Sequence, residues 1–266
     1  MVVPFSKYHA NGNDFILILS DHLSKKDLTR PTISKLCCRH TGVGADGLFL
    51  VSPSDSYDFI LDYYNADGSW ETLCANGSRC AAQEMYHLGR VKKDIFFLAG
   101  DGPHKAKILE SGIVAMKMKT PEYRSKNISP GGLNGHFIDS GARHFISESN
   151  DLSEEFVLEW GEKIRHAQLF HPKGINVNFY KLIDKNTVKI MTYEKGVEGV
   201  MMSCASGSTA VIFHLSNTGL VKSPALVCSS GGNLTFDFDG GWENAWSSGP
   251  AQIVFYGNIE LNRISK

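Results

Sequence analysis

Apolar residues along this 266-residue chain follow mostly the pattern of β-strands. Short β-branched or aromatic runs, each bounded by turn residues, recur through both halves. They cover residues 14–19, 47–51, 58–65, 94–100, 144–149, 175–183, 187–194, 233–240 and 251–261. Residues 104–119 alternate on both sides of Glu110-Ser111-Gly112, which predicts a β-hairpin. Many strands with few helices predict an α+β fold.

The clearest helices are predicted directly after two cysteines. Cys74 begins the stretch CANGSRC, and Cys204 begins the similar stretch CASGSTA. We expect Asn76 to cap the first helix and Ser206 to cap the second, because asparagine and serine are favoured N-caps. The helix ends are predicted at Gly89 and Gly219, since glycine often follows a last turn. Each cysteine is therefore expected just ahead of a helix N-terminus.

One motif points to nucleotide binding but stands in the wrong context. Residues 42–47, GVGADG, match Gly-x-Gly-x-x-Gly. This pattern binds dinucleotides when a strand precedes it and a helix follows it. Here a predicted helix at 32–40 comes first and the predicted strand at 47–51 follows. We therefore do not expect a nucleotide site.

The spacing around the two cysteines indicates an internal duplication. Asn13 lies 61 residues before Cys74, and Ala142, in a Gly-Ala-Arg-His stretch, lies 62 residues before Cys204. A predicted strand also starts 28 residues before each cysteine. We expect two pseudo-symmetric α/β-mixed domains around a central cleft, each bringing one cysteine to it. Residues 118–135 are the expected crossing between them.

Composition excludes several classes of protein. The chain is 42% hydrophobic and 21% charged, its net charge is −1, and like charges form no block, so neither nucleic acid nor a membrane is an expected partner. The first residues lack the pattern of a signal peptide, and no apolar run approaches the roughly 20 residues of a membrane span. We expect a cytoplasmic protein. Its six cysteines include no Cys-x-x-Cys pair, so no metal site is expected.

Two cysteines at helix N-termini suit proton transfer at carbon. Backbone amides there stabilise a thiolate and lower the thiol pKa from its usual value of about 8.5, and they can also bind a carboxylate. A thiolate on one face of a carbon and a thiol on the other can invert a stereocentre. The main alternative is a Cys/His hydrolase with His144 as its base, which leaves one cysteine without a role. The other four cysteines are expected to be structural: Cys37, Cys38, Cys80 and Cys228.

At this point the sequence resembles the diaminopimelate epimerase family, which are cofactor-independent two-cysteine amino-acid epimerases. The resemblance runs nearly from end to end, and the blocks around the two cysteines are its most specific parts. The matching blocks are residues 7–15, 39–51, 64–80, 174–180, 193–210, 231–234 and 248–260.

The resemblance implies that Cys74 and Cys204 are an acid–base pair that epimerises LL- to meso-diaminopimelate without a cofactor. It places His144 and Glu194 near the thiols. The substrate contacts that it implies are Asn13, Asn65, Ala75, Asn76, Asn176, Glu194, Lys195, Ala205 and Ser206. It also implies a first domain of residues 1–117, joined by the final strand 252–262, and a second of residues 118–251. A homodimer is a candidate assembly.

Several positions depart from the usual residues of the family. Ala75 and Ala205 replace glycines and add a methyl group beside the expected carboxylate. Ala142 replaces an asparagine, Lys195 an arginine, and Val200-Met201 a Glu-Thr pair, and lysine cannot form the bidentate contacts of arginine. These changes leave the two-thiol chemistry intact. Two alternative functions therefore stay open. The chain could be a related racemase with another substrate, or a catalytically weakened homologue that acts as a binding protein.

Overall fold

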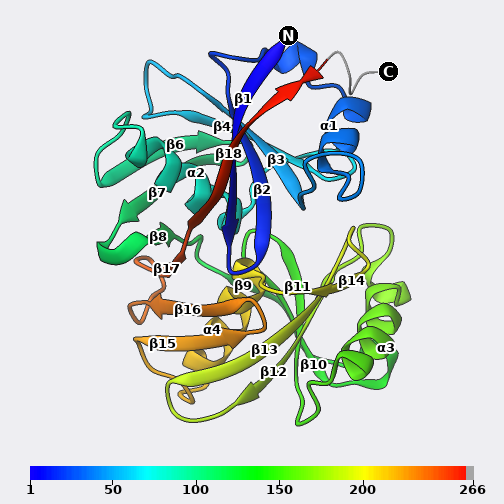
Figure 1. Ribbon diagram of the computed structural model, residues 1–266. Helices are drawn as coiled ribbons and strands as arrows, with labels where there is room; N and C mark the ends of the chain where they lie inside the picture. The colour runs from blue at the N-terminus through cyan, green and yellow to red at the C-terminus, as the bar shows by residue number, and fades with distance from the viewer. Residues whose placement is uncertain (262–266) are drawn as a thin grey trace. The chain divides into compact units, whose positions relative to one another are not determined.

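The computed structural model describes residues 1–261. The described residues form two compact units, one of residues 1–116 and 249–261, the other of residues 117–248. Each unit combines a mixed sheet with two α-helices in its described residues (Figure 1). This architecture confirms the predicted α+β class.

The first unit is built on nine strands in the described residues. These are β1 (Val2–Ala10), β2 (Asn13–Leu19), β3 (Gly47–Ser52), β4 (Ile60–Asn65), β5 (Trp70–Glu71), β6 (Asp94–Ala99), β7 (Gly102–Ile108), β8 (Ile113–Lys117) and β18 (Gln252–Glu260). Antiparallel pairs join β18 to β1, β1 to β2 and β3 to β4, while β2 and β3 are parallel. β4 is antiparallel to β5 and parallel to β6, and β6, β7 and β8 pair antiparallel in sequence.

The second unit repeats this pairing. Its strands are β9 (Glu122–Ile128), β10 (Gly135–Asp139), β11 (Arg143–Glu148), β12 (Asn176–Leu182), β13 (Thr187–Glu194), β14 (Gly199–Met201), β15 (Ala225–Ser229), β16 (Gly232–Asp237) and β17 (Trp246–Pro250). β10 pairs antiparallel with both β9 and β11. β11 and β12 are parallel, and β12 and β13 are antiparallel. β13 then pairs with β14 and β15, and β15, β16 and β17 are antiparallel. The correspondence confirms the predicted pseudo-symmetric duplication.

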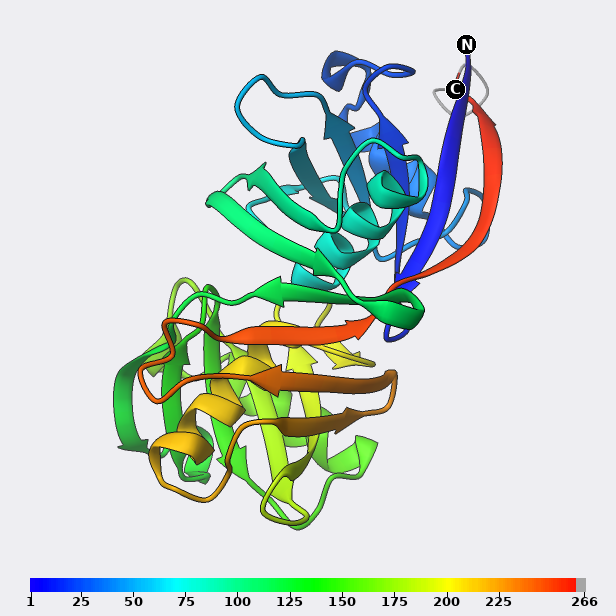
Figure 2. The ribbon, with the colours of Figure 1, turned by 90° about the vertical axis from the view of Figure 1, so that its left-hand side faces the viewer.

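Each unit has one helix on either side of its sheet. α2 (Ala75–His87) packs against β1, β2, β3, β7 and β18, and Figure 2 shows it between β7 and β1. α4 (Ala205–Asn217) packs against β11, β12 and β16. α1 (Arg30–Cys37) contacts β3, and α3 (Glu154–Arg165) contacts β12, β13 and β14. The helices that follow the cysteines are therefore enclosed by strands.

The predicted helix caps are wrong, although the helix ends are confirmed. Cys74 and Cys204 are themselves the N-cap residues, both with φ −132°, and neither side chain makes a capping hydrogen bond. Asn76 and Ser206 lie inside the first turn because their side chains bond to more distant partners, described below. Gly89 and Gly219 follow the last turns with φ 69° and 73°.

Some elements have weak or overlooked sequence signals. Strand β9, EYRSKNI, alternates between half-buried and exposed positions and has no fully buried residue, so the hydrophobic pattern does not reveal it. It lies in the expected crossing segment, but pairs with β10 inside the second unit. Helix α3 was also not predicted, although Ser153 caps it by accepting a hydrogen bond from the backbone N–H of Phe156.

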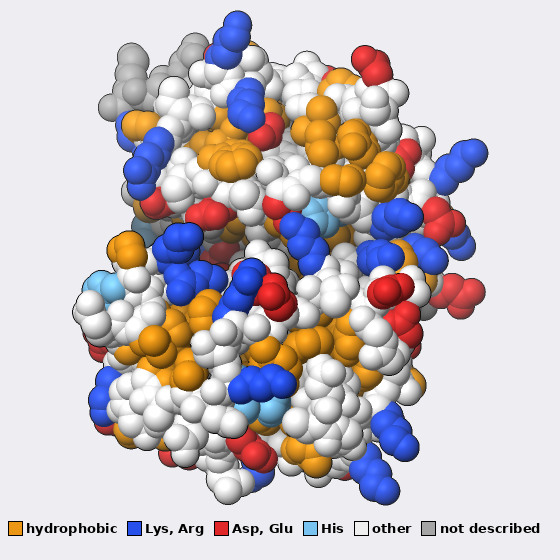
Figure 3. Space-filling view, turned by 180° about the vertical axis from the view of Figure 1, so that it is seen from behind, with side chains coloured by type: hydrophobic (Ala, Val, Ile, Leu, Met, Phe, Trp, Pro, Cys, Tyr) orange, Lys and Arg blue, Asp and Glu red, His pale blue; other side chains and the backbone are white. Residues whose placement is uncertain are grey.

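Charged side chains of both signs are interspersed on the face of the molecule in Figure 3. This distribution agrees with the net charge of −1. Among the described residues, no helix is long and apolar enough to cross a membrane.

Two glycines allow α2 and α4 to approach their sheets closely. A Cβ atom at Gly77 would overlap the ring of Phe49, and one at Gly207 would overlap the amide of Asn178. Phe49 is fully buried and stacks on Tyr63, with ring centroids 4.7 Å apart. The start of α2 therefore has no room for a larger residue.

We predict that Gly77→Ala lowers the free energy of unfolding by about 1–3 kcal/mol, because the added methyl group overpacks a buried contact. Gly240→Ala is the matched control, since a Cβ atom there meets no atom within 4 Å; its effect should stay within about 0.5 kcal/mol. Urea unfolding of both variants tests this. Equal stability of the two would contradict the close approach of α2 to Phe49.

Candidate active site

The first half-site surrounds Cys74 at the start of α2. The Cys74 Sγ lies 3.8 Å from the Oδ1 atom of Asn13, and Asn76 Nδ2 donates to the same oxygen at 3.2 Å. Asn13 is the first residue of β2, directly after the β1–β2 turn. Three of the predicted site residues are thus brought together.

The amide of Asn13 has one allowed orientation. Its Nδ2 donates to Asp46 Oδ2 at 2.7 Å, and a carboxylate can only accept. The Oδ1 atom must therefore face Cys74 and Asn76. Because Oδ1 can only accept, the hydrogen bond from Cys74 requires a protonated sulfur, and this contact favours the thiol.

Asp46 belongs to a cluster of four charged residues that sequence reasoning missed. Arg39 binds Asp46 at 2.6 Å and Asp14 at 2.8 Å, and Lys7 binds Asp14 at 2.6 Å. Burial opposes ionisation of Asp14, but hydrogen bonds from Arg39 and Lys7 outweigh it and lower the pKa of Asp14 to about 2. All four lie in the two N-terminal motif blocks, so their sequence signal was present but unassigned.

Asn65 is the last residue of β4, and nearby residues in the sequence hold its side-chain amide. Its Oδ1 accepts from the hydroxyl of Tyr63 at 2.8 Å, and its Nδ2 donates to Ser69 Oγ at 3.1 Å. Asn65 pairs with Gly47 across the β3–β4 ladder. It is therefore a fixed amide at the end of the strand that precedes Cys74.

The second half-site surrounds Cys204 at the start of α4. The Cys204 Sγ lies 3.6 Å from Ser206 Oγ, which lies 2.9 Å from His144 Nε2. The other ring nitrogen, Nδ1, lies 3.0 Å from Asn178 Nδ2. His144 is thus linked to the sulfur through Ser206, and this chain of hydrogen bonds also includes Asn178, which was not predicted.

The direction of these hydrogen bonds follows from one carbonyl group. Asn178 Nδ2 also donates to the carbonyl of Phe145 at 3.1 Å, so this atom is the amide nitrogen. His144 Nδ1 must then accept and its Nε2–H donates to Ser206, so the hydrogen of the Ser206 hydroxyl is available for Cys204. A donor aimed at the sulfur favours the thiolate.

His144 is neutral in this arrangement. It is fully buried, and burial lowers its pKa to about 3 despite the opposing effect of Asp139. Its place opposite Asn176 in the parallel β11–β12 ladder positions the ring beneath the start of α4. The residue therefore acts as a hydrogen-bond donor at neutral pH.

The remaining predicted residues of the second unit lie at strand ends. Asn176 Oδ1 accepts from the backbone N–H of Lys195 at 2.9 Å. Glu194 is the last residue of β13, and its carbonyl accepts from the N–H of Glu198 at 2.9 Å. Asn176, Glu194 and Lys195 therefore form one group at the start of β12 and the end of β13.

Backbone amides at both helix starts are turned toward the cysteines. The first intrahelical bonds run from Ser78 N to Cys74 O at 2.8 Å and from Ser208 N to Cys204 O at 2.9 Å. The N–H groups of Ala75 and Ala205 precede these bonds and are not used inside their helices. The positive end of a helix dipole therefore lies beside each sulfur.

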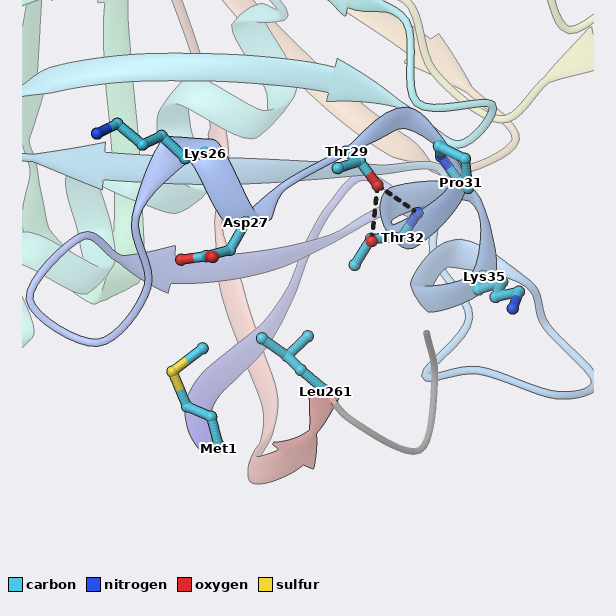
Figure 4. Close-up of a pocket in the computed structure, with 8 residues that line it drawn as sticks. All are labelled: Met1, Lys26, Asp27, Thr29, Pro31, Thr32, Lys35 and Leu261. Carbon is cyan, nitrogen blue, oxygen red and sulfur yellow. Dashed lines mark hydrogen bonds between the residues drawn. The ribbon is translucent and has the colours of Figure 1, made fainter. Parts of the chain in front are cut away.

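A cavity of about 410 Å³ lies elsewhere, between Met1, Leu261 and the start of α1 (Figure 4). There Thr29 accepts a hydrogen bond from the backbone N–H of Thr32 and caps the helix. None of its lining residues belongs to either half-site. In the part of the chain that the structure describes, no group of three or more His, Cys, Asp or Glu side chains could hold a metal ion.

Known proteins with sequences similar to this chain carry the same name. The diaminopimelate epimerase family profile matches residues 5–123. A diaminopimelate epimerase from Aquifex aeolicus is 34% identical over 97% of this chain and 98% of its own length. One from Flavobacterium psychrophilum is 36% identical over 94% of this chain and 97% of its own length.

Solved structures share the fold at much lower sequence identity. A hydroxyproline epimerase from Agrobacterium vitis has a TM-score of 0.74 at 14% identity, covering 97% of this chain and 92% of its own. A phenazine biosynthesis protein from Bacillus anthracis has a TM-score of 0.72 at 14% identity, and the match covers 98% of this chain and 99% of its own. These likenesses concern the fold alone.

The buried neutral histidine predicts a particular dependence of stability on pH. The pKa of His144 is about 3 in the folded chain and about 6.5 when unfolded. Between these values the unfolded state binds one more proton, so stability falls as the pH drops from about 6.5 toward 3. This residue contributes a slope of about 1.4 kcal/mol per pH unit.

His144→Gln should remove that slope from the free energy of unfolding between pH 6 and 4. Urea unfolding at several pH values measures it, with His22→Gln, an exposed position, as the matched control. If both variants keep the full slope of the parent, His144 is not buried in its neutral form.

Proposed function

This chain belongs to the diaminopimelate epimerase family, and we propose that it interconverts LL- and meso-diaminopimelate with two thiols. The thiolate of one cysteine removes the α-proton. The thiol of the other supplies a proton to the opposite face of the same carbon. The proton lost by one sulfur is balanced by the proton gained by the other, and the reverse reaction exchanges their roles. The product serves lysine and cell-wall precursor synthesis.

The observation that carries this proposal is the opposite hydrogen-bond direction at the two sulfurs. Cys74 faces an acceptor, Asn13 Oδ1, and this contact favours a thiol. Cys204 faces the Ser206 hydroxyl, which favours a thiolate. One acid and one base in the resting protein are what a two-base inversion needs.

The helix starts support binding of the carboxylate next to the reacting carbon. The backbone N–H groups of Ala75 and Ala205, with those of Asn76 and Ser206, are suited to the carboxylate oxygens on which charge develops as the α-proton leaves. No electron-accepting cofactor is needed in this scheme, because backbone donors and helix dipoles stabilise the developing charge.

We assign the substrate's polar groups to the fixed amides and to the strand-end group. Asn13 presents its Oδ1 and so suits an ammonium group, while Asn65 and Asn176 are held at strand ends by their own hydrogen bonds. To a second amino-acid group we assign Glu194 and Lys195. Because Lys195 is an ammonium instead of a guanidinium, its contact is a single point charge.

Exchange of the α-proton in deuterated water tests the proposed function. The protein is incubated with LL-diaminopimelate and, separately, with a panel of other amino acids, and deuterium incorporation and inversion are followed by mass spectrometry and chiral chromatography. We expect both with diaminopimelate. Inversion of another amino acid alone would identify a related racemase, and binding without exchange would identify a non-catalytic homologue.

Replacing either cysteine should abolish inversion. Cys74→Ala or Cys204→Ala removes a group that acts as acid in one direction and base in the other, so we expect the loss in both directions to exceed about 10³-fold. Cys228→Ala is the matched control, because this half-buried thiol on β15 lies in neither half-site. Substantial inversion by either of the first two variants would rule out the two-base scheme.

We further propose that two copies associate through β18. Four consecutive apolar side chains on this strand, Ile253 to Tyr256, are 42–55% exposed. They adjoin a cavity of about 710 Å³ formed with β1 and α2. Residues 251–257 contain no charged residue, so a two-fold axis could place this apolar patch against its own copy without opposing like charges.

Val254→Lys should convert such a dimer to a monomer, because Val254 is 54% exposed and a buried lysine would lack a partner. Ile183→Lys is the control, since Ile183 is equally exposed at 54% but lies in the second unit. Light scattering coupled to size exclusion reads the mass. A monomeric parent protein, or a dimer that survives Val254→Lys alone, would contradict this interface.

We also propose that the enzyme acts in the cytoplasm and binds neither nucleic acid nor membrane. None of its six cysteines forms a disulfide among the described residues, and the net charge of −1 gives a polyanion no overall attraction. On the face shown in Figure 3, charges of both signs are interspersed. Reduced thiols are what its chemistry requires.

A further inference from the structure

Arg79 is a buried arginine on α2, five residues after Cys74, and its side chain is 0% exposed. Its Nη2 donates to Asn11 Oδ1 and to Asn76 Oδ1, both at 3.0 Å. Its Nε and Nη1 atoms have no hydrogen-bond partner among the described residues. Burying a guanidinium with unpaired N–H groups is costly, so this position needs a physical reason.

No carboxylate in the described part of the chain forms an ion pair with Arg79. Its two hydrogen-bond partners are neutral amides. The acidic groups on α2 and on the elements around it are bound by other residues. These contacts are Asp14 to Lys7 and Arg39, Asp46 to Arg39, Glu84 to Tyr8 and Tyr256, and Asp101 to His104. Glu260, at the end of β18, is exposed. The charge of Arg79 is therefore not balanced by any of them.

The remaining ionisable groups that interact with Arg79 are two thiols. Burial lowers the pKa of Arg79 to about 10, with opposing interactions from Cys80 and Cys74, so the guanidinium stays charged at neutral pH. Burial also raises the pKa of Cys80, which is 0% exposed. Cys80 is therefore a neutral thiol, and Cys74 is the remaining group that can carry a balancing negative charge, once its proton has left.

We propose that Arg79 is a positioning residue whose guanidinium is the buried counter-cation of the Cys74 thiolate. This inference rests on the acid–base role proposed for Cys74. Asn13 Oδ1 accepts from the thiol, and Arg79 compensates the charge once the proton has left, so both protonation states of the sulfur have a partner. The same position in α4 is Thr209, which is uncharged and bonds to the carbonyl of Ala205.

The pH dependence of thiol alkylation tests this directly. In a parent protein that carries Cys38→Ala and Cys228→Ala, iodoacetamide modification of Cys74 and Cys204 is followed by mass spectrometry from pH 5.5 to 10. Arg79→Met should raise the thiol pKa of Cys74 by at least about 1 unit, and so lower its alkylation rate at pH 7 about tenfold or more. Arg79→Lys, which keeps a charge, should restore most of the rate. The thiol pKa of Cys204 should not change.

Thr209→Val is the matched control, and it should leave the thiol pKa of both cysteines unchanged. The proposal is overturned if Arg79→Met does not shift Cys74, if Arg79→Lys shifts it as much, or if Cys204 shifts equally. If Arg79→Met fails to fold, the measurement on the parent protein tests the proposal. The proposal then requires that the thiol pKa of Cys74 in the parent lies below about 8.5. A parent that meets this condition but exchanges no α-proton would refute the proposed function and leave the role of Arg79 standing.

Discussion

In each unit the chemistry of the cysteine depends on the orientation of one asparagine amide. A hydrogen-bond partner that can only accept holds this amide in a single orientation. Asp46 fixes Asn13, and the carbonyl of Phe145 fixes Asn178. Asn13 thereby turns an oxygen toward Cys74, whereas Asn178 turns a nitrogen toward His144 and sets the donor direction that reaches Cys204. Rotating either amide by half a turn would reverse the bias on the sulfur. The direction of the hydrogen bond at each sulfur thus depends on an orienting bond that does not itself involve sulfur.

The two units have the same backbone but different polar groups. Both cysteines are N-caps with φ −132°, and both helices cover 13 residues. Beneath the helix starts the units diverge, because Gly77 packs on the ring of Phe49 while Gly207 packs on the amide of Asn178. A repeated backbone gives each sulfur the same access to helix N–H groups. The divergent layer beneath allows one sulfur to be held as a thiol while the other is favoured as a thiolate.

Many of the strands, the duplication and the position of each cysteine before a helix could be predicted from sequence, because they depend on local patterns and on spacing. Strands β1, β10, β15 and β17 were not predicted. The helix caps could not. Asn76 and Ser206 have the propensity of N-caps, but hydrogen bonds to Asn13 and His144, more than 60 positions earlier, engage their side chains instead. Asp46 was missed for the same reason, since its role appears only when β2 and the start of β3 are brought together. The role of each of these polar residues is therefore set by hydrogen-bond partners that are distant in the sequence.

The same geometry distinguishes proton transfer at carbon from the chemistry of a Cys/His hydrolase. In such a hydrolase the histidine takes the thiol proton and keeps it while the sulfur attacks. Here Ser206 stands between His144 and Cys204, and the histidine's Nδ1 already accepts from an amide. Burial lowers the pKa of the ring to about 3, so it is a poor proton acceptor at neutral pH. His144 can therefore stabilise a thiolate through Ser206 without holding its proton, which leaves the sulfur itself as the group that gains and loses protons.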